Sequence, residues 1–243
     1  MSLPKIAVTK YKLKLPSTGK EISYRPFLVK EEKILMMALQ AGESVDVVQA
    51  LRDVITSCVE SDIDVKSMTM FDIEYVFLQL RARSVGDMVK FSYTAKDEFC
   101  KDTKTLCNFD VELNIDDIKI NKNKDHKDVI DITDTIKVKL KYPEIEMANQ
   151  LAGASGDDLV NATFRMIAQS VEYIMDGVEM HNPSDYTEKE MDDFLNSLST
   201  EQFQKVQNFF DTMPKLRHET TGVCSVCQKE NKRVLEGLGD FFA

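Results

Sequence analysis

The sequence of 243 residues predicts an α+β fold, for two reasons. Hydrophobic residues recur at helical spacing in some segments and alternate with polar residues in others, so helices and strands come in runs rather than in regular βα units. Two cysteine pairs, Cys100 with Cys107 and Cys224 with Cys227, each lie between two strand-like runs. We therefore expect an N-terminal β-hairpin, two groups of helices and a small, discontinuous β element resembling a zinc ribbon.

The first 90 residues predict the hairpin followed by three helices. Residues 7–15 and 21–28 are extended runs separated by turn residues, Pro16 to Gly19. Three helical runs begin near residues 30, 44 and 69. Cys58 continues the apolar stripe of the second run, so we expect it in the core as a small hydrophobic residue.

The two halves of the β element are expected at residues 91–118 and 214–243, the second including the C-terminal tail. Alternating apolar residues flank each cysteine pair. Four thiolates at about 2.3 Å from one Zn²⁺ form a closed structural site, and cysteine-tipped hairpins are how zinc ribbons are built. We predict structural zinc on Cys100, Cys107, Cys224 and Cys227. A hairpin without metal, or His218 in place of one cysteine, remains an alternative.

Between these halves lie residues 119–213, called the insertion below. A lysine-rich connection at 119–128 leads to a strand at 136–142 and then to acidic helices. Apolar residues repeat at helical spacing at five positions, which predicts one helix of about five turns; they are Val160, Phe164, Ile167, Val171 and Ile174. Capping boxes that pair Thr187 with Glu190 and Ser199 with Gln202 predict two shorter helices.

The negative charge of the chain is concentrated in the insertion. Residues 144–213 hold 14 acidic and three basic residues, a net charge of −11, whereas the whole chain has −10. Such a segment is not a nucleic-acid surface; it is either a solvated face or a surface for a basic partner. Carboxylates and surplus aromatic residues lead us to assign partner contacts to Asp192, Asp193, Phe209, Phe241 and Phe242.

Composition and motifs indicate a cytoplasmic protein without enzymatic activity. No apolar run approaches the ~20 residues that span a bilayer, and the N-terminus lacks the pattern of a signal peptide. The odd number of five cysteines argues against a disulfide framework. Nucleophile elbows, phosphate-binding loops and metalloprotease motifs are absent from the sequence, and its three histidines have no motif partner.

Three motifs in order resemble the baseplate hub subunit family of T4-like contractile-tailed bacteriophages. They are residues 25–33, residues 72–86, and the Cys224 and Cys227 pair followed by residues 237–242. The resemblance covers about residue 20 to the end, except the stretch near 119–135. Arg25, Arg81 and Arg83 within these motifs can pair with carboxylates, and we favour partners inside the fold.

The resemblance implies a late, non-enzymatic protein of tail assembly that helps to build the central hub. It would act in the host cytoplasm, as a structural subunit that enters the virion tail baseplate or as an assembly factor. Its partners would be other baseplate hub proteins, with no nucleic acid, membrane or small-molecule substrate. The alternative is a zinc-ribbon regulator that binds nucleic acid, because Lys229, Lys232 and Arg233 cluster near the cysteines.

Overall fold

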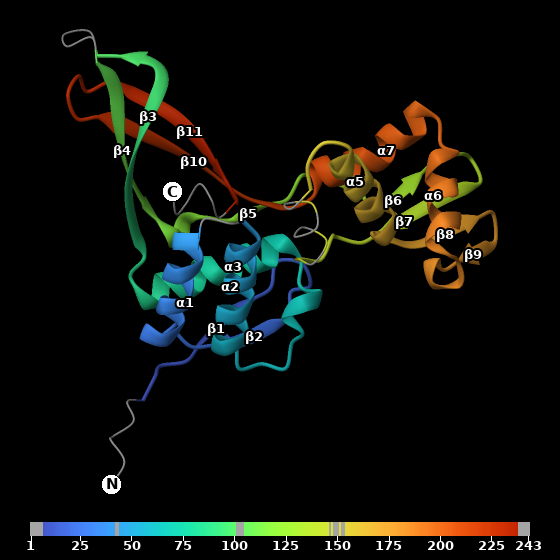
Figure 1. The fold of residues 1–243 in the computed structure, drawn as a ribbon, viewed down its shortest axis with the longest axis horizontal. Helices are drawn as coiled ribbons and strands as arrows, with labels where there is room; N and C mark the ends of the chain where they lie inside the picture. The colour runs from blue at the N-terminus through green and yellow to red at the C-terminus, as the bar shows by residue number, and fades with distance from the viewer. Residues whose placement is uncertain are drawn as a thin grey trace.

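The computed structural model describes residues 7–41, 44–100, 105–145, 147, 151 and 154–237. These residues form six α-helices and eleven β-strands, and every strand pairing is antiparallel. A helical body lies at one end and the insertion at the other, with the long β element rising from the body (Figure 1). The expected mixture of helices and antiparallel sheets is confirmed. No helix in the described residues is both long and apolar enough to cross a membrane.

The body consists of residues 7–87 and begins with the expected hairpin. Its strands pair over four residues each, and Gly19, at a φ of +71°, supplies the left-handed turn between them. The body elements are β1 (Tyr11–Lys14), β2 (Glu21–Tyr24), α1 (Val29–Ala41), α2 (Ser44–Cys58) and α3 (Met70–Ser84). Thr69 caps α3 as expected, since its side chain accepts from the backbone N–H of Asp72.

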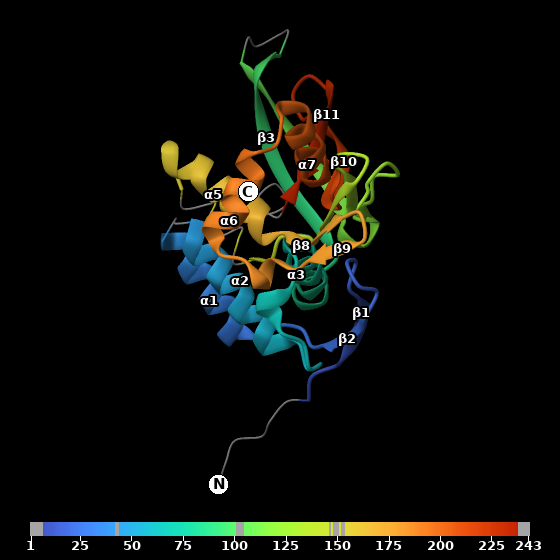
Figure 2. The same cartoon turned by 90° about the vertical axis from the view of Figure 1, so that its right-hand side faces the viewer.

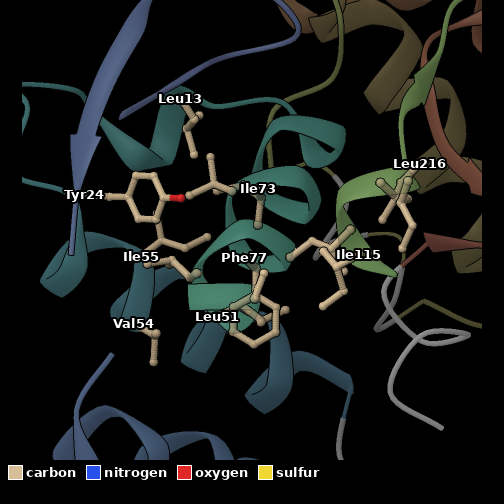
Figure 3. Packing of buried hydrophobic residues seen from close by; sticks show 14 of the residues in the cluster. Leu13, Tyr24, Leu51, Val54, Ile55, Ile73, Phe77, Ile115 and Leu216 are labelled. Atoms are coloured by element: carbon tan, nitrogen blue, oxygen red, sulfur yellow. The ribbon is translucent and has the colours of Figure 1, made fainter. Parts of the chain in front are cut away.

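One hydrophobic core joins the body to the base of the β element (Figure 3). Residues from the hairpin, two helices and two distant strand ends meet there; those labelled are Leu13, Tyr24, Leu51, Val54, Ile55, Ile73, Phe77, Ile115 and Leu216. Cys58 is fully buried in the same core, as predicted. Because each such side chain contributes about 1.5–3 kcal/mol on burial, Ile115 and Leu216 anchor the β element firmly.

The arginines of the resembling motifs pair within the fold. The guanidinium of Arg25 donates to Glu31 Oε1 at 2.8 Å and to the carbonyl of Ser57 at 2.8 Å, which ties β2 to α1 and α2. Arg81 donates to the Gly86 carbonyl at 3.3 Å, and Arg83 lies 3.4 Å from Asp116. The preference for internal partners is thus confirmed.

The insertion has a separate hydrophobic core. A four-stranded sheet, in the order β6-β7-β8-β9, packs against three helices. The elements are β6 (Val129–Asp131), β7 (Ile136–Leu140), α5 (Asp157–Gln169), β8 (Val171–Asp176), β9 (Glu179–His181), α6 (Glu188–Asn196) and α7 (Thr200–Thr212). Both capping boxes are present at the starts of α6 and α7, as predicted.

The prediction of one long helix through Ile174 is wrong. Helix α5 ends at Gln169, and the next residues form β8 in register with β7. Ser170 caps the helix, since its hydroxyl donates to the Met166 carbonyl at 2.8 Å. Val171 and Ile174 continue the helical spacing by coincidence; the β-branched and aromatic residues before the turn at Gly177 are the signal for a strand that spacing alone missed.

The assignment of Phe209 to a partner surface is also wrong. Its side chain is only 1% exposed and belongs to the core of the insertion. Its ring lies 4.9 Å from that of His126 and 5.6 Å from that of Tyr142. The lysine-rich connection supplies His126 as a packing partner, and this partner was not visible in the periodicity of α7.

The same aromatic group forms the joint between body and insertion. His126 hydrogen-bonds through Nδ1 to the Thr212 hydroxyl at 3.0 Å and through Nε2 to the Tyr142 hydroxyl at 3.1 Å. Tyr142 also meets Phe71 of α3 edge to face, at 5.1 Å between ring centroids. Burial lowers the pKa of His126. The joint is therefore a packed contact rather than a free linker.

We expect Glu31→Gln to destabilise the chain by about 3 kcal/mol at neutral pH. Burial opposes ionisation of Glu31, but Arg25, the Leu28 N–H and Lys30 lower its pKa from 4.5 to about 2, and each pKa unit corresponds to about 1.4 kcal/mol. A carboxyl group whose pKa is lower in the folded than in the unfolded chain stabilises the fold at pH values above its unfolded pKa. The difference in unfolding free energy between wild type and Glu31→Gln should therefore be full above pH 4.5 and vanish as the pH falls towards 2.

Urea unfolding of the full chain at several pH values measures this difference. Glu32→Gln, an exposed neighbour in the same helical turn, is the control and should change stability by less than about 0.5 kcal/mol. Equal effects of the two substitutions would contradict the assigned role of Glu31.

Candidate metal centre

Two β-hairpins far apart in the sequence form one sheet, called the ribbon below. Its strands are β3 (Met88–Phe99), β4 (Leu106–Asn114), β10 (Lys215–Cys224) and β11 (Glu230–Glu236), in the order β11-β10-β4-β3. A short strand, β5 (Ile120–Asn121), pairs with the start of β10. Strands β4 and β10 pair only at Asp110 with Val223 and at Phe109 with Cys224. The hairpins thus meet at their tips and diverge towards the body, as Figures 1 and 2 show.

The four predicted cysteines come together at this tip. Their sulfur atoms all lie within 4.8 Å of one another. The Cys100 Sγ lies 3.5 Å from Cys107 Sγ and 3.7 Å from Cys224 Sγ, and Cys107 Sγ lies 3.7 Å from Cys227 Sγ. A tetrahedron with metal–sulfur bonds of about 2.3 Å has sulfur–sulfur edges of about 3.8 Å. All four are free thiols, so their spacing matches ligation of one metal rather than disulfides.

The turn at Cys224 and Cys227 is shaped to aim sulfur atoms inward. The Gln228 N–H donates to the Cys224 carbonyl, and the Cys224 N–H donates to the Lys229 carbonyl, each at 2.9 Å. Gln228 takes a φ of 57°, which reverses the chain just after the second cysteine. The backbone N–H groups of Cys227 and Val226 point at Cys224 Sγ and lower its thiol pKa to about 6. This turn therefore stabilises a thiolate.

Both cysteines of the other pair, Cys100 and Cys107, are buried. Burial raises the pKa of Cys107 to about 12, with neighbouring thiols acting in the same direction, and burial also raises the pKa of Cys100. Four adjacent thiolates, three of them buried, repel one another unless a cation lies among them. The donor set of four sulfurs favours Zn²⁺ or another soft metal ion. His218 is not in this group; it stands on β10 opposite Leu235 of β11.

Aromatic and charged residues pack behind the cysteines. The rings of Tyr93 and Phe109 stack at 5.5 Å, and the guanidinium of Arg233 lies 4.8 Å above Tyr93. Lys229 Nζ lies 3.0 Å from Glu98 Oε2. Two of the three basic residues that suggested nucleic-acid binding are thus engaged within the ribbon.

The other predicted site residues lie away from the cysteines. Asp192 and Asp193 are exposed on α6 of the insertion. Phe241 and Phe242 lie outside the described residues. Hydrophobic periodicity did not reveal the joint at His126. The only sequence signal for it was a single histidine within a lysine-rich stretch.

The fold defines a mixed α/β protein of three parts, in which a four-thiol cluster clamps two sequence-distant hairpins. The chain belongs to the family described as T4 bacteriophage base plate protein, whose model matches residues 8–243. This result confirms the resemblance at the level of a T4-like phage baseplate protein and supports a structural role in the virion tail, in contact with other tail proteins. The nucleic-acid alternative gains no support from this family. Searches of curated proteins and of solved structures gave no significant match.

We expect Gly222→Ala to destabilise the ribbon by roughly 1–3 kcal/mol through overpacking. A Cβ at this position would lie 2.8 Å from the Cβ of Phe109 and 3.2 Å from the ring of Tyr93, and neither can withdraw from the buried sheet. Hydrogen exchange of the β4 and β10 amides should rise in this variant.

Ser225→Ala, in the exposed turn of the same hairpin, is the matched control and should leave exchange unchanged. Unaltered protection in Gly222→Ala would show that β10 and β4 are not packed as closely as described.

Proposed function

We propose that this protein is a non-enzymatic component of the central hub of the baseplate, acting as a subunit or assembly factor through protein contacts. The carrying observation is the four-cysteine cluster, which brings together the tips of two hairpins that the acidic insertion separates in the sequence. Membership of the baseplate family supports the setting. The finer assignment to the hub comes from the resemblance of the sequence motifs.

Three polar groups of kinds that often serve in catalysis have structural partners in the described residues. The histidine rings of the insertion bond to tyrosine hydroxyls, His126 to Tyr142 and His181 to Tyr186 at 2.7 Å. The buried carboxylate of Glu31 is held by Arg25. These partners support a structural role for the three side chains, in line with a protein that acts through contacts with other proteins.

Zinc in this proposal is a structural ion held by Cys100, Cys107, Cys224 and Cys227. It would neutralise part of the thiolate charge and fix the two hairpin tips relative to each other. Lys229, beside Cys107 and Cys227, is placed to offset the remaining negative charge.

Protein purified in reducing buffer without chelator should contain about one Zn²⁺ per chain. Cys224→Ser should lower this content towards zero and lower the unfolding temperature, because binding energy at such a site is folding energy. Elemental analysis and calorimetry measure the two effects.

Cys58→Ser is the matched control, since Cys58 is equally buried but lies in the core of the body. It should destabilise the chain without changing the zinc content. A zinc content near zero in fresh wild-type protein would rule out the proposed ion while leaving the hub assignment standing.

Affinity capture of the tagged full chain from infected cells tests the hub role. Other baseplate proteins should be recovered in a salt-sensitive manner if the acidic insertion faces a basic partner. Combined Asp192→Lys and Asp193→Lys, and separately deletion of Phe241 and Phe242, should each reduce recovery several-fold without unfolding the chain.

Glu172→Lys with Glu179→Lys makes the same charge change on the sheet of the insertion and should have a smaller effect. Recovery of nucleic acid instead of baseplate proteins would refute the proposed function. Normal recovery in both test variants would place the partner surface elsewhere on the chain.

A further inference from the structure

A groove in the insertion has a lining that is about equally apolar and polar, with two carboxylates that are called the acidic rim below. It lies between α5 and α6, has a volume of about 570 Å³ and is bordered by the segment around Pro183. Its apolar lining comes from Val160, Phe164, Ala168, Tyr186 and Met191, and its charged lining from Arg165, Glu188 and Asp192. Val160 is 57% exposed. Part of the apolar stripe of α5 is therefore left uncovered by the fold.

A helix face of matching chemistry lies on the body. Helix α1 packs against α2, and its outer face exposes Val29, Ile34, Met36 and Met37, the last with 71% exposure. Lys33 is exposed on this same face, and so is Lys30, whose ammonium also lies 3.2 Å from the buried Glu31. Methionine-rich apolar faces adapt to partners of varied shape, and contiguous exposed apolar residues of this kind mark interaction sites.

We propose that the groove between α5 and α6 binds the outer face of α1 from a second copy of this chain. The apolar side chains of α1 would fill the groove, and Lys30 and Lys33 would face Glu188 and Asp192. Arg165 in the groove finds a carboxylate on α1 in the exposed Glu32. The charges and the apolar surfaces are thus complementary in the manner of a helix bound in a groove.

The placement of the two surfaces makes the contact head to tail. Helix α1 and the insertion lie at opposite ends of one molecule (Figure 1), so one chain cannot satisfy both surfaces by folding on itself. Each copy offers one helix face and one groove. A contact of this type is heterologous and repeats into a ring or an open row of subunits. This inference goes beyond the hub assignment, which needs only contacts with other proteins.

Two single variants of the full chain separate the two surfaces. Met37→Glu places an acid against the acidic rim, and Val160→Lys places a lysine against the lysines of α1. Both residues are exposed, so the chain should stay folded. In sedimentation velocity, wild-type protein should form larger species as its concentration rises, and each variant alone should associate at least tenfold more weakly.

A mixture of the two variants gives the decisive result. The Val160→Lys chain keeps a normal α1, and the Met37→Glu chain keeps a normal groove, so an equimolar mixture should form a dimer and nothing larger. Met88→Glu and Val178→Lys make the same changes at exposed apolar residues outside both surfaces and should associate as wild type does.

The proposal is overturned if the wild-type chain stays monomeric at every concentration, if the mixture does not dimerise, or if the control variants lose association equally. It is also overturned if the groove proves to be occupied by a different baseplate protein in the captured complex. The first three results would leave recovery of baseplate proteins unchanged, so the hub role would be judged separately. The fourth result would overturn self-association while supporting the hub role.

Discussion

The junction between the two hairpin tips is the contact that joins two sequence-distant hairpins into one ribbon. Strands β4 and β10 share only two residue pairs, and Cys107 and Cys227 are separated by 120 positions in the chain. A strand hydrogen bond contributes about 1 kcal/mol, so two residue pairs hold the tips together only weakly. Further contacts between the two tips are those among the four cysteines.

The base of the ribbon is held in a different way. Ile115 and Leu216 are buried in the core of the body, together with Leu235 from β11. Hydrophobic burial therefore fixes the ends of β4, β10 and β11 that lie near the body, whatever happens at the tip. Between the base and the tip, β10 pairs with β11 along one edge, and its other edge is not paired with β4. The ribbon is thus clamped at two places by two kinds of interaction, apolar packing and sulfur chemistry.

These clamps also determine where the insertion lies. The chain leaves the ribbon after Asn121, at the end of β5, and returns at Lys215, at the start of β10. These two residues are paired in the short β5–β10 ladder. The insertion therefore starts and ends at neighbouring points. At this neck His126, Tyr142 and Phe71 pack in succession, from insertion to body. Such a neck limits rotation of the insertion and keeps its acidic helices directed away from α1.

Sequence patterns predicted the features that depend on local chemistry. Thr69, Thr187 and Ser199 mark helix starts because a hydroxyl satisfies backbone N–H groups only a few residues away. The grouping of the four cysteines could also be predicted from the sequence, because few residue types can act as metal ligands. The end of α5 at Ser170 was not accessible from spacing, because pairing with β7 decides that β8 is a strand. Phe209 was misassigned for the same reason: its cover, His126, comes from a segment 83 positions earlier in the sequence.

The core at the ribbon tip is much smaller than the core of the body. The buried cluster at the tip contains three cysteines and Phe109, with Tyr93 and Cys227 beside it. A core this small cannot offset the loss of chain entropy on folding, and small domains of this kind rely on metals or disulfides. At the same tip Phe99 and Val226 remain exposed. Because this apolar surface faces solvent, hydrophobic packing contributes little at the tip, and the zinc ligation proposed above would be the interaction that holds it in shape.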